Sequence, residues 1–141
     1  MRAVRYAVAD RFPAPIERVF AIFAEPSRLP EWLPGCQAAT SEGPLRAGGY
    51  IEAHFNQRVT EFEVTEFAPP HAFGWRERGA RKGSRLVVRL GQAEEFTTIG
   101  LRATWTPPSG KAWVRGHLLE RRAVEDQLKT ILANLRRILT V

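Results

Sequence analysis

Apolar and polar side chains alternate along most of the chain between residues 36 and 106, and this alternation constrains the fold more than any other feature. A period of two predicts strands that each bury one face. Segments rich in glycine, proline and polar residues divide the region into six strands, with turns at 42–49, 67–72, 79–84 and 91–95. A further alternating segment at residues 4–8 brings the predicted antiparallel sheet to about seven strands.

The side chains that would face each other across three hairpins indicate how the strands pair. A symmetric hairpin around residues 67–72 pairs Val64 with Trp75 and Glu63 with Arg76, a favourable pair of opposite charges. The next two turns are predicted to bring Val88 close to both Trp75 and Ile99. One face of the sheet then carries Phe62, Val64, Phe73, Trp75, Leu86, Val88, Leu90, Ile99, Leu101, Ala103 and Trp105, and the other carries Glu61, Glu63, Arg76, Arg78, Arg85, Arg89 and Arg102. Because a slip of one residue would mix the two sets, the pattern predicts a sheet with one buried face.

The segment from Lys111 to the C-terminus contains no proline and predicts one long helix. Its apolar residues form one stripe: Val114, Leu118, Val124, Leu128, Ile131, Leu132, Leu135, Ile138 and Leu139. The stripe and the apolar face of the sheet must bury against each other. In the N-terminal half of the helix, polar residues interrupt the stripe at His117, Arg121 and Glu125. Either this half extends into solvent, or His117 or Arg121 supplies a polar group to an apolar pocket.

Between the first predicted strand and the rest of the sheet lie two short helical segments. The first carries Ile16, Val19, Phe20 and Phe23 at helical spacing. The second is broken by prolines in the sequence "EPSRLPEWLPG" at residues 25–35. We expect its Trp32 to close a gap between sheet and helix, at the rim of a cavity rather than in the densest part of the core.

Two stretches of the sequence resemble one known superfamily. "APIERVFAIFAEPSRLPEWLPG" resembles the first helices of the polyketide cyclase/dehydrase and lipid-transport superfamily, also called START-like, SRPBCC or birch-pollen-allergen-like proteins. "VTEFEVTEFAPPHAFGWRER" resembles the central hairpin of the same proteins. The resemblance implies an α+β helix-grip fold in the order β-α-α-β6-α, as a single START-like ligand-binding domain over residues 1–141. It also implies a cavity between the curved sheet and the long C-terminal helix.

The resemblance further implies a small hydrophobic ligand, such as a lipid, a quinone or a polyketide-like molecule. From its position on the helix, Arg121 is suited either to an anionic group of the ligand or to an ion pair with Glu77 or Glu125. The residues expected to bind it are Trp32, Phe55, Phe62, Trp75, Val88, Ile99, Leu101, Trp105, His117, Arg121 and Val124. The alternative for each apolar residue is that it only fills the core, which is the usual role of aromatic side chains on an inner sheet face.

Signals of catalysis are sparse. The histidines His54, His71 and His117 do not have the spacing of metal ligands, and no phosphate-binding loop or nucleophile motif occurs. We therefore expect no metal and no cofactor, and Cys36 is interpreted as a small buried residue. The weak candidates for an acid or base are His117 and Glu77. Glu77 occupies a strand position whose side chain should point to the apolar face of the sheet. Its place near a hairpin tip nevertheless favours the interpretation that it reaches water.

Three classes of function remain open. The first is a non-catalytic binder of a hydrophobic ligand, and the second is a polyketide cyclase/dehydrase-type enzyme that uses the same cavity. The third is a protein-interaction module that uses the basic outer face of the sheet. The formal net charge is +6 but no long basic run occurs, so no specific nucleic-acid partner is predicted. The absence of a long apolar run and of a signal-peptide pattern, together with a single cysteine, predicts a cytoplasmic protein without a transmembrane segment. The sequence gives no prediction of the oligomeric state.

Overall fold

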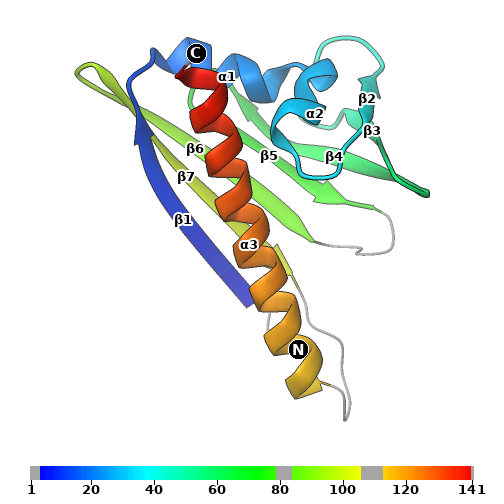
Figure 1. Ribbon diagram of the computed structural model, residues 1–141. Coiled ribbons are helices and arrows are strands. Elements are labelled where there is room, and N and C mark those ends of the chain that lie inside the picture. The colour runs from blue at the N-terminus through cyan, green and yellow to red at the C-terminus, as the bar shows by residue number, and fades with distance from the viewer. Residues whose placement is uncertain (1–3, 79–83, 106–112, 141) are drawn as a thin grey trace.

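The computed structural model describes residues 4–78, 84–105 and 113–140 (Figure 1). Within these residues the elements are β1 (Val4–Phe12), α1 (Ile16–Ala24), η1 (Pro26–Arg28), α2 (Leu29–Trp32), β2 (Ala38–Ser41), β3 (Tyr50–Phe55), β4 (Arg58–Ala68), β5 (Ala72–Glu77), β6 (Arg85–Ala93), β7 (Phe96–Trp105) and α3 (Trp113–Leu139). The seven described strands form one antiparallel sheet in the order β1-β7-β6-β5-β4-β3-β2. The predicted α+β helix-grip fold and its element order are confirmed.

The sheet curves around α3, which crosses its concave side, and α1 and α2 lie near the C-terminal end of α3 (Figure 1). α1 begins directly after Pro15, and its spaced apolar residues Ile16, Val19, Phe20 and Phe23 are buried as predicted. α1 contacts β6 and β7, whereas α2 contacts α3 and β2. The two short helices therefore cover one end of the groove between the sheet and α3.

The predicted register of the β4–β5 hairpin is correct away from its turn. Glu63 lies opposite Arg76 and Val64 opposite Trp75, and the Glu63 and Arg76 side chains form an ion pair. Nearer the turn, a bulge between Val64 and Glu66 shifts the pairing by one residue, so that the hairpin is not symmetric. A bulge inserts one extra residue into one strand, which the symmetric prediction did not include.

In the two following hairpins the predicted register is wrong by two residues. Trp75 lies opposite Leu86 instead of Val88, and Val88 lies opposite Leu101 instead of Ile99. The β6–β7 turn also comes later than predicted, with Glu94 at a φ of 55° and the ladder extending to Ala93 and Phe96. A shift of two residues leaves every side chain on its predicted face, since side chains alternate with a period of two. Alternation therefore determined the faces correctly but could not detect this error.

The buried face of the sheet and the stripe of α3 form the core together. All predicted inward residues are buried except Ala103, which is partly exposed, and on α3 Val124, Leu128, Ile131, Leu135 and Leu139 are buried. The side chains of Val114 and Leu118 lie outside the described part of the structure. On the other face, Arg78, Arg85, Arg89 and Arg102 are exposed as predicted.

None of the described helices combines the length and the apolar character needed to cross a lipid bilayer.

Candidate ligand-binding cavity

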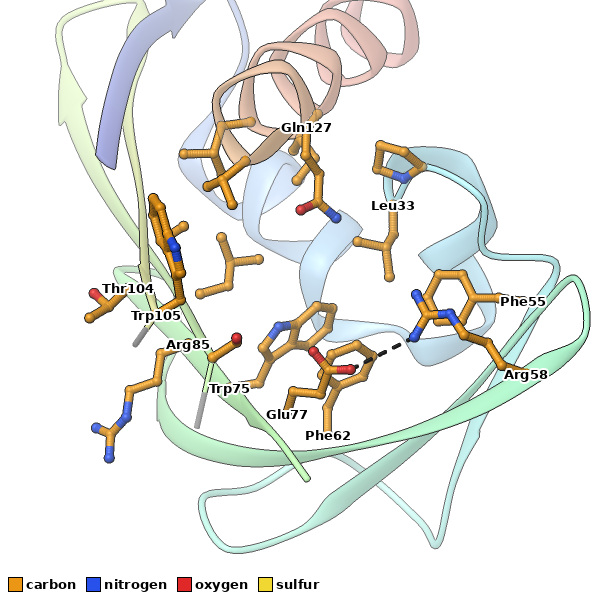
Figure 2. A pocket seen from close by; sticks show the side chains of 17 residues that line it. Leu33, Phe55, Arg58, Phe62, Trp75, Glu77, Arg85, Thr104, Trp105 and Gln127 are labelled. Carbon is orange, nitrogen blue, oxygen red and sulfur yellow. Dashed lines mark ion pairs between the residues drawn. The ribbon is translucent and has the colours of Figure 1, made fainter. Parts of the chain in front are cut away.

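A cavity lies between the inner face of the sheet and the middle of α3 (Figure 2). The space open to the centres of water molecules is about 110 Å³, several times what one water molecule needs. Strands β3 to β7, the segment after α2 and one face of α3 contribute to its wall. The lining residues are Leu33, Pro34, Phe55, Arg58, Phe62, Trp75, Glu77, Ser84, Arg85, Leu86, Ala103, Thr104, Trp105, Val124, Gln127, Leu128 and Ile131.

Stacked aromatic rings form one wall of the cavity. The rings of Phe62 and Trp75 are parallel to within 18°, with centroids 4.1 Å apart. Trp32 stacks on Trp75 at 5.5 Å and meets Phe23 edge-on at 4.9 Å. Phe62 and Trp75 come from neighbouring strands, so the sheet itself holds the two cavity-lining rings in place. The wall is therefore supported on its far side by the aromatic core.

Trp32 does not lie at the rim of the cavity, so the expectation that it would lie there was wrong. Its side chain has no exposed surface, and it is not among the lining residues. α2 is a single turn that contacts both β2 and α3, and Asn134 of α3 donates a hydrogen bond to the backbone carbonyl of Trp32 at 3.1 Å. These contacts hold α2 against the core, with the indole between the rings of Phe23 and Trp75. The next two residues, Leu33 and Pro34, line the cavity instead.

A carboxylate and a guanidinium face each other at one end of the cavity (Figure 2). Glu77 ends β5, and its residue surface is only 8% exposed. Nη1 of Arg58, the first residue of β4, lies 3.7 Å from Oε1 of Glu77. The same Arg58 nitrogen donates a hydrogen bond to Oγ1 of Thr60 at 2.7 Å, and the guanidinium lies 4.3 Å from the centre of the Phe55 ring. Arg58 is thus held in a fixed position although about half of its side chain is exposed.

The favoured interpretation that Glu77 reaches water at a hairpin tip was wrong. Glu77 lies opposite Phe62 in the β4–β5 ladder, and its backbone N–H donates to the carbonyl of Ser84 at 2.8 Å, one residue beyond the β5–β6 ladder. Its side chain therefore keeps the inward direction that its parity dictates. It remains a candidate acid or base by position, because it is a buried carboxylate beside a cavity.

Five of the residues predicted to bind the ligand do line this cavity: Phe55, Phe62, Trp75, Trp105 and Val124. Val88, Ile99 and Leu101 are buried in the core of the sheet and are not among the lining residues. Arg121 is exposed on α3 and does not line the cavity either. The side chain of His117 lies outside the described part of the structure.

Arg58 and several residues of α3 were missed by the sequence reasoning, although the sequence contained a signal for them. Arg58 has the same parity as Thr60 and Phe62, which places it on the inner face after a tight turn in which Gln57 has a φ of 68°. On α3, Gln127, Leu128 and Ile131 follow Val124 at spacings of three, four and seven residues, on one side of the helix.

The Cys36 thiol is not among the lining groups of the cavity. Burial raises the pKa of the Cys36 thiol, which donates to the carbonyl of Ala38 at 3.4 Å, so the thiol is a poor nucleophile. In the described part of the chain, no three His, Cys, Asp or Glu side chains are grouped so that they could hold a metal ion. The cavity therefore offers aromatic packing, the facing charges of Glu77 and Arg58, and the polar side chains of Ser84, Thr104 and Gln127. Arg85 also lines it, but its guanidinium points away from Glu77 (Figure 2).

The sequence matches the family "Polyketide cyclase / dehydrase and lipid transport" over residues 3–140, and the chain belongs to this family. No curated protein matches the sequence significantly.

Several solved structures share the fold at low sequence identity. The di-domain ARO/CYC StfQ from the steffimycin biosynthetic pathway aligns with a TM-score of 0.78 and 12% identity, over 98% of this chain and 51% of that protein. Protein NE0264 from Nitrosomonas europaea aligns with a TM-score of 0.76 and 16% identity, over 96% and 94% of the two chains. PFC0360w, an HSP90 activator from Plasmodium falciparum, aligns with a TM-score of 0.70 and 23% identity, over 96% of each chain. At these identities the similarity shows the fold alone.

Proposed function

We propose that the protein binds a small hydrophobic ligand in the cavity between the sheet and α3, without transforming it. The observation that carries this proposal is the lining itself, in which Phe62, Trp75 and Trp105 face Val124 and Leu128 of α3 around open space. Mostly apolar cavities with a few convergent polar groups are the usual form of small-molecule sites. Membership of a family described by lipid transport as well as by polyketide cyclisation is consistent with this function.

A second candidate is an enzyme of the polyketide cyclase/dehydrase type, and the position of Glu77 favours it. A buried carboxylate that faces a cavity with an aromatic wall is placed to accept a proton from a bound substrate. StfQ, which shares the fold, is an aromatase/cyclase. The third class, a protein-interaction module, receives less support, because such a module needs no cavity between the sheet and α3, whereas this protein has one. Its arginines are also partly neutralised, since Arg76 pairs with Glu63 and Arg89 pairs with Glu66.

The test is native mass spectrometry of protein purified without added ligand, followed by extraction of bound molecules and by titration with the neutral dye Nile red. A Val124→Phe variant should fill the cavity and lose both the co-purified molecule and dye binding. An Ala133→Phe variant adds the same ring at an exposed position of the same helix and should keep both. A folded Val124→Phe protein that binds as well as the wild type would refute binding in this cavity.

The molecule extracted from the Glu77→Gln variant separates the two candidate functions, because an active wild-type enzyme would already have converted its own bound molecule. Incubation with fresh protein should leave its mass unchanged if the protein is a binder. Loss of one water molecule, abolished by Glu77→Gln, would instead identify a dehydrating cyclase with Glu77 as its acid or base.

A further inference from the structure

Building on the proposed function, we propose that Arg58 and Glu77 together recognise a hydroxyl group of a neutral ligand and discriminate against ligands of either charge. The ligand class is then a hydrophobic alcohol or phenol whose apolar body lies against the aromatic wall of Phe62 and Trp75. The two polar side chains act as specificity determinants for the cavity, and no chemical step is assigned to them.

The distance between the two groups leaves room for a ligand atom. Nη1 of Arg58 and Oε1 of Glu77 are 3.7 Å apart, whereas a direct charge-assisted hydrogen bond is about 2.7–2.9 Å long. Arg58 has five N–H donors, and the hydrogen bond to Thr60 occupies one of them. A carboxylate accepts several hydrogen bonds. Among the described residues, both groups therefore have unused hydrogen-bonding capacity at the same end of the cavity (Figure 2).

Both groups are also held before any ligand arrives. The backbone of Glu77 is positioned by its pairing opposite Phe62 on β4 and by its hydrogen bond to the carbonyl of Ser84. Arg58 is positioned by Thr60 and by the ring of Phe55. Groups that are already ordered lose little side-chain entropy on binding, so their hydrogen bonds to a ligand are retained as affinity.

The charges of the pair determine which ligand group fits. A carboxylate on the ligand would meet the buried carboxylate of Glu77, and an ammonium group would meet the guanidinium of Arg58. A hydroxyl donates to Glu77 and accepts from Arg58, so it satisfies both. A ligand without a polar group would exclude water from Glu77 and leave its oxygens without a new partner, which is costly for a buried charged group. This inference replaces the expected role of Arg121, which is exposed outside the cavity.

The experiment compares four two-ring probes that differ only in one substituent: 2-naphthol, 2-methylnaphthalene, 2-naphthoate and 2-naphthylmethylammonium. Dissociation constants are measured by isothermal titration calorimetry at pH 7. The wild type should bind 2-naphthol about 10-fold more tightly than each of the other three, as expected for one additional hydrogen bond to a charged group.

Two variants should change this preference in opposite directions. Glu77→Gln removes the negative charge and keeps the size, so 2-naphthoate should overtake 2-naphthol. Arg58→Met removes the positive charge, so 2-naphthylmethylammonium should become the preferred probe. Arg58 is half exposed, so its variant keeps the test valid even if Glu77→Gln does not fold. The matched controls on the outer face, Glu61→Gln and Arg102→Met, should retain the wild-type order.

Each other result contradicts the inference in a recognisable way. If all four probes bind to the wild type with similar constants and the variants keep them, the pair does not select the ligand, while the proposed cavity binding stands. If the preferred probe of the wild type is an ion, the pair does not act as a neutral hydroxyl receptor. If no probe binds, both the inference and the proposed function fail.

Discussion

The two ends of the groove between the sheet and α3 are built from the same alternating pattern but are filled differently. At the end near the C-terminus of α3, α1 and α2 cover the groove, and Phe23, Trp32 and Leu135 are fully buried (Figure 1). Nearer the N-terminus of α3, Val124 and Leu128 border the open space of the cavity, and Glu77 faces this space from the sheet. The short helices α1 and α2 therefore decide which part of one apolar face becomes core. We call these regions the packed end and the cavity end.

The largest expected effect is at the packed end, and two leucines of α3 form a matched pair for measuring it. Both leucines are buried, but Leu128 borders the cavity whereas Leu135 is not among the lining residues. Leu135→Ala should lower the free energy of unfolding by about 3–5 kcal/mol and Leu128→Ala by about 2–3 kcal/mol, within the usual range for buried leucines. Urea unfolding followed by circular dichroism measures both. Equal losses, or a larger loss for Leu128→Ala, would remove the distinction between the two ends.

Trp32→Phe should give the next largest effect. Its indole packs between Phe23 and Trp75, and its Nε1 has no hydrogen-bond partner among the described residues. The substitution therefore loses packing but no described hydrogen bond, and it should cost about 1–3 kcal/mol, less than truncation of a buried tryptophan to alanine. Thermal unfolding provides the measurement, with Nile red titration as the control for the cavity. Unchanged stability with lost dye binding would return Trp32 to the ligand site.

Glu77→Leu should leave stability unchanged or raise it by about 1 kcal/mol, while it weakens binding of 2-naphthol. The carboxylate is buried, and its ion pair with Arg58 is long, so its desolvation is poorly compensated. Residues that serve binding often lower the stability of the fold, and Glu77 is expected to do so. Chemical unfolding together with calorimetry tests both parts. A loss of several kcal/mol would show that Glu77 supports the fold instead.

The smallest expected effect is a pH dependence at the packed end, where Asp10 of β1 accepts a hydrogen bond from Nη2 of Arg136 at 2.6 Å. Burial alone would raise the pKa of Asp10, but the hydrogen bonds from Arg136 and the Arg11 backbone, with their charges, outweigh it and lower the pKa. A lowered pKa means that the contribution to stability is present above the unfolded value of about 4 and is lost as the pH falls through the folded value. Because both groups are partly exposed, we expect the ion pair to contribute less than about 1 kcal/mol to the free energy of unfolding.

The measurement compares wild type with Asp10→Asn in urea at several pH values. The stability difference between them should be constant near neutral pH and should shrink below about pH 4. A difference that grows on acidification would have the wrong sign for this ion pair.

The faces of the sheet and the stripe of α3 could be predicted because alternation and helical periodicity are local properties of the sequence. The two-residue error at Trp75 and Val88 could not be detected, since such a shift changes no face. Alternation also could not show that Glu77 is buried, because its burial depends on how far the end of β5 stays paired with its neighbouring strands. The depth of Trp32 depends on contacts with Trp75 of β5 and Asn134 of α3, which lie far from it in the sequence. Arg58, in contrast, could have been assigned to the inner face from its parity with Phe62.

The most direct test of ligand binding at the cavity end is a set of intermolecular nuclear Overhauser effects between bound 2-naphthol and the methyl groups of α3. One helix supplies reporters at both ends, with Val124 and Leu128 at the cavity and Leu135 and Leu139 in the packed core. We predict cross-peaks from the naphthol protons to the methyl groups of Val124 and Leu128, and none to those of Leu135 and Leu139. Bound naphthol that gives cross-peaks to Leu135 or Leu139, and none to Val124 or Leu128, would contradict the proposed site.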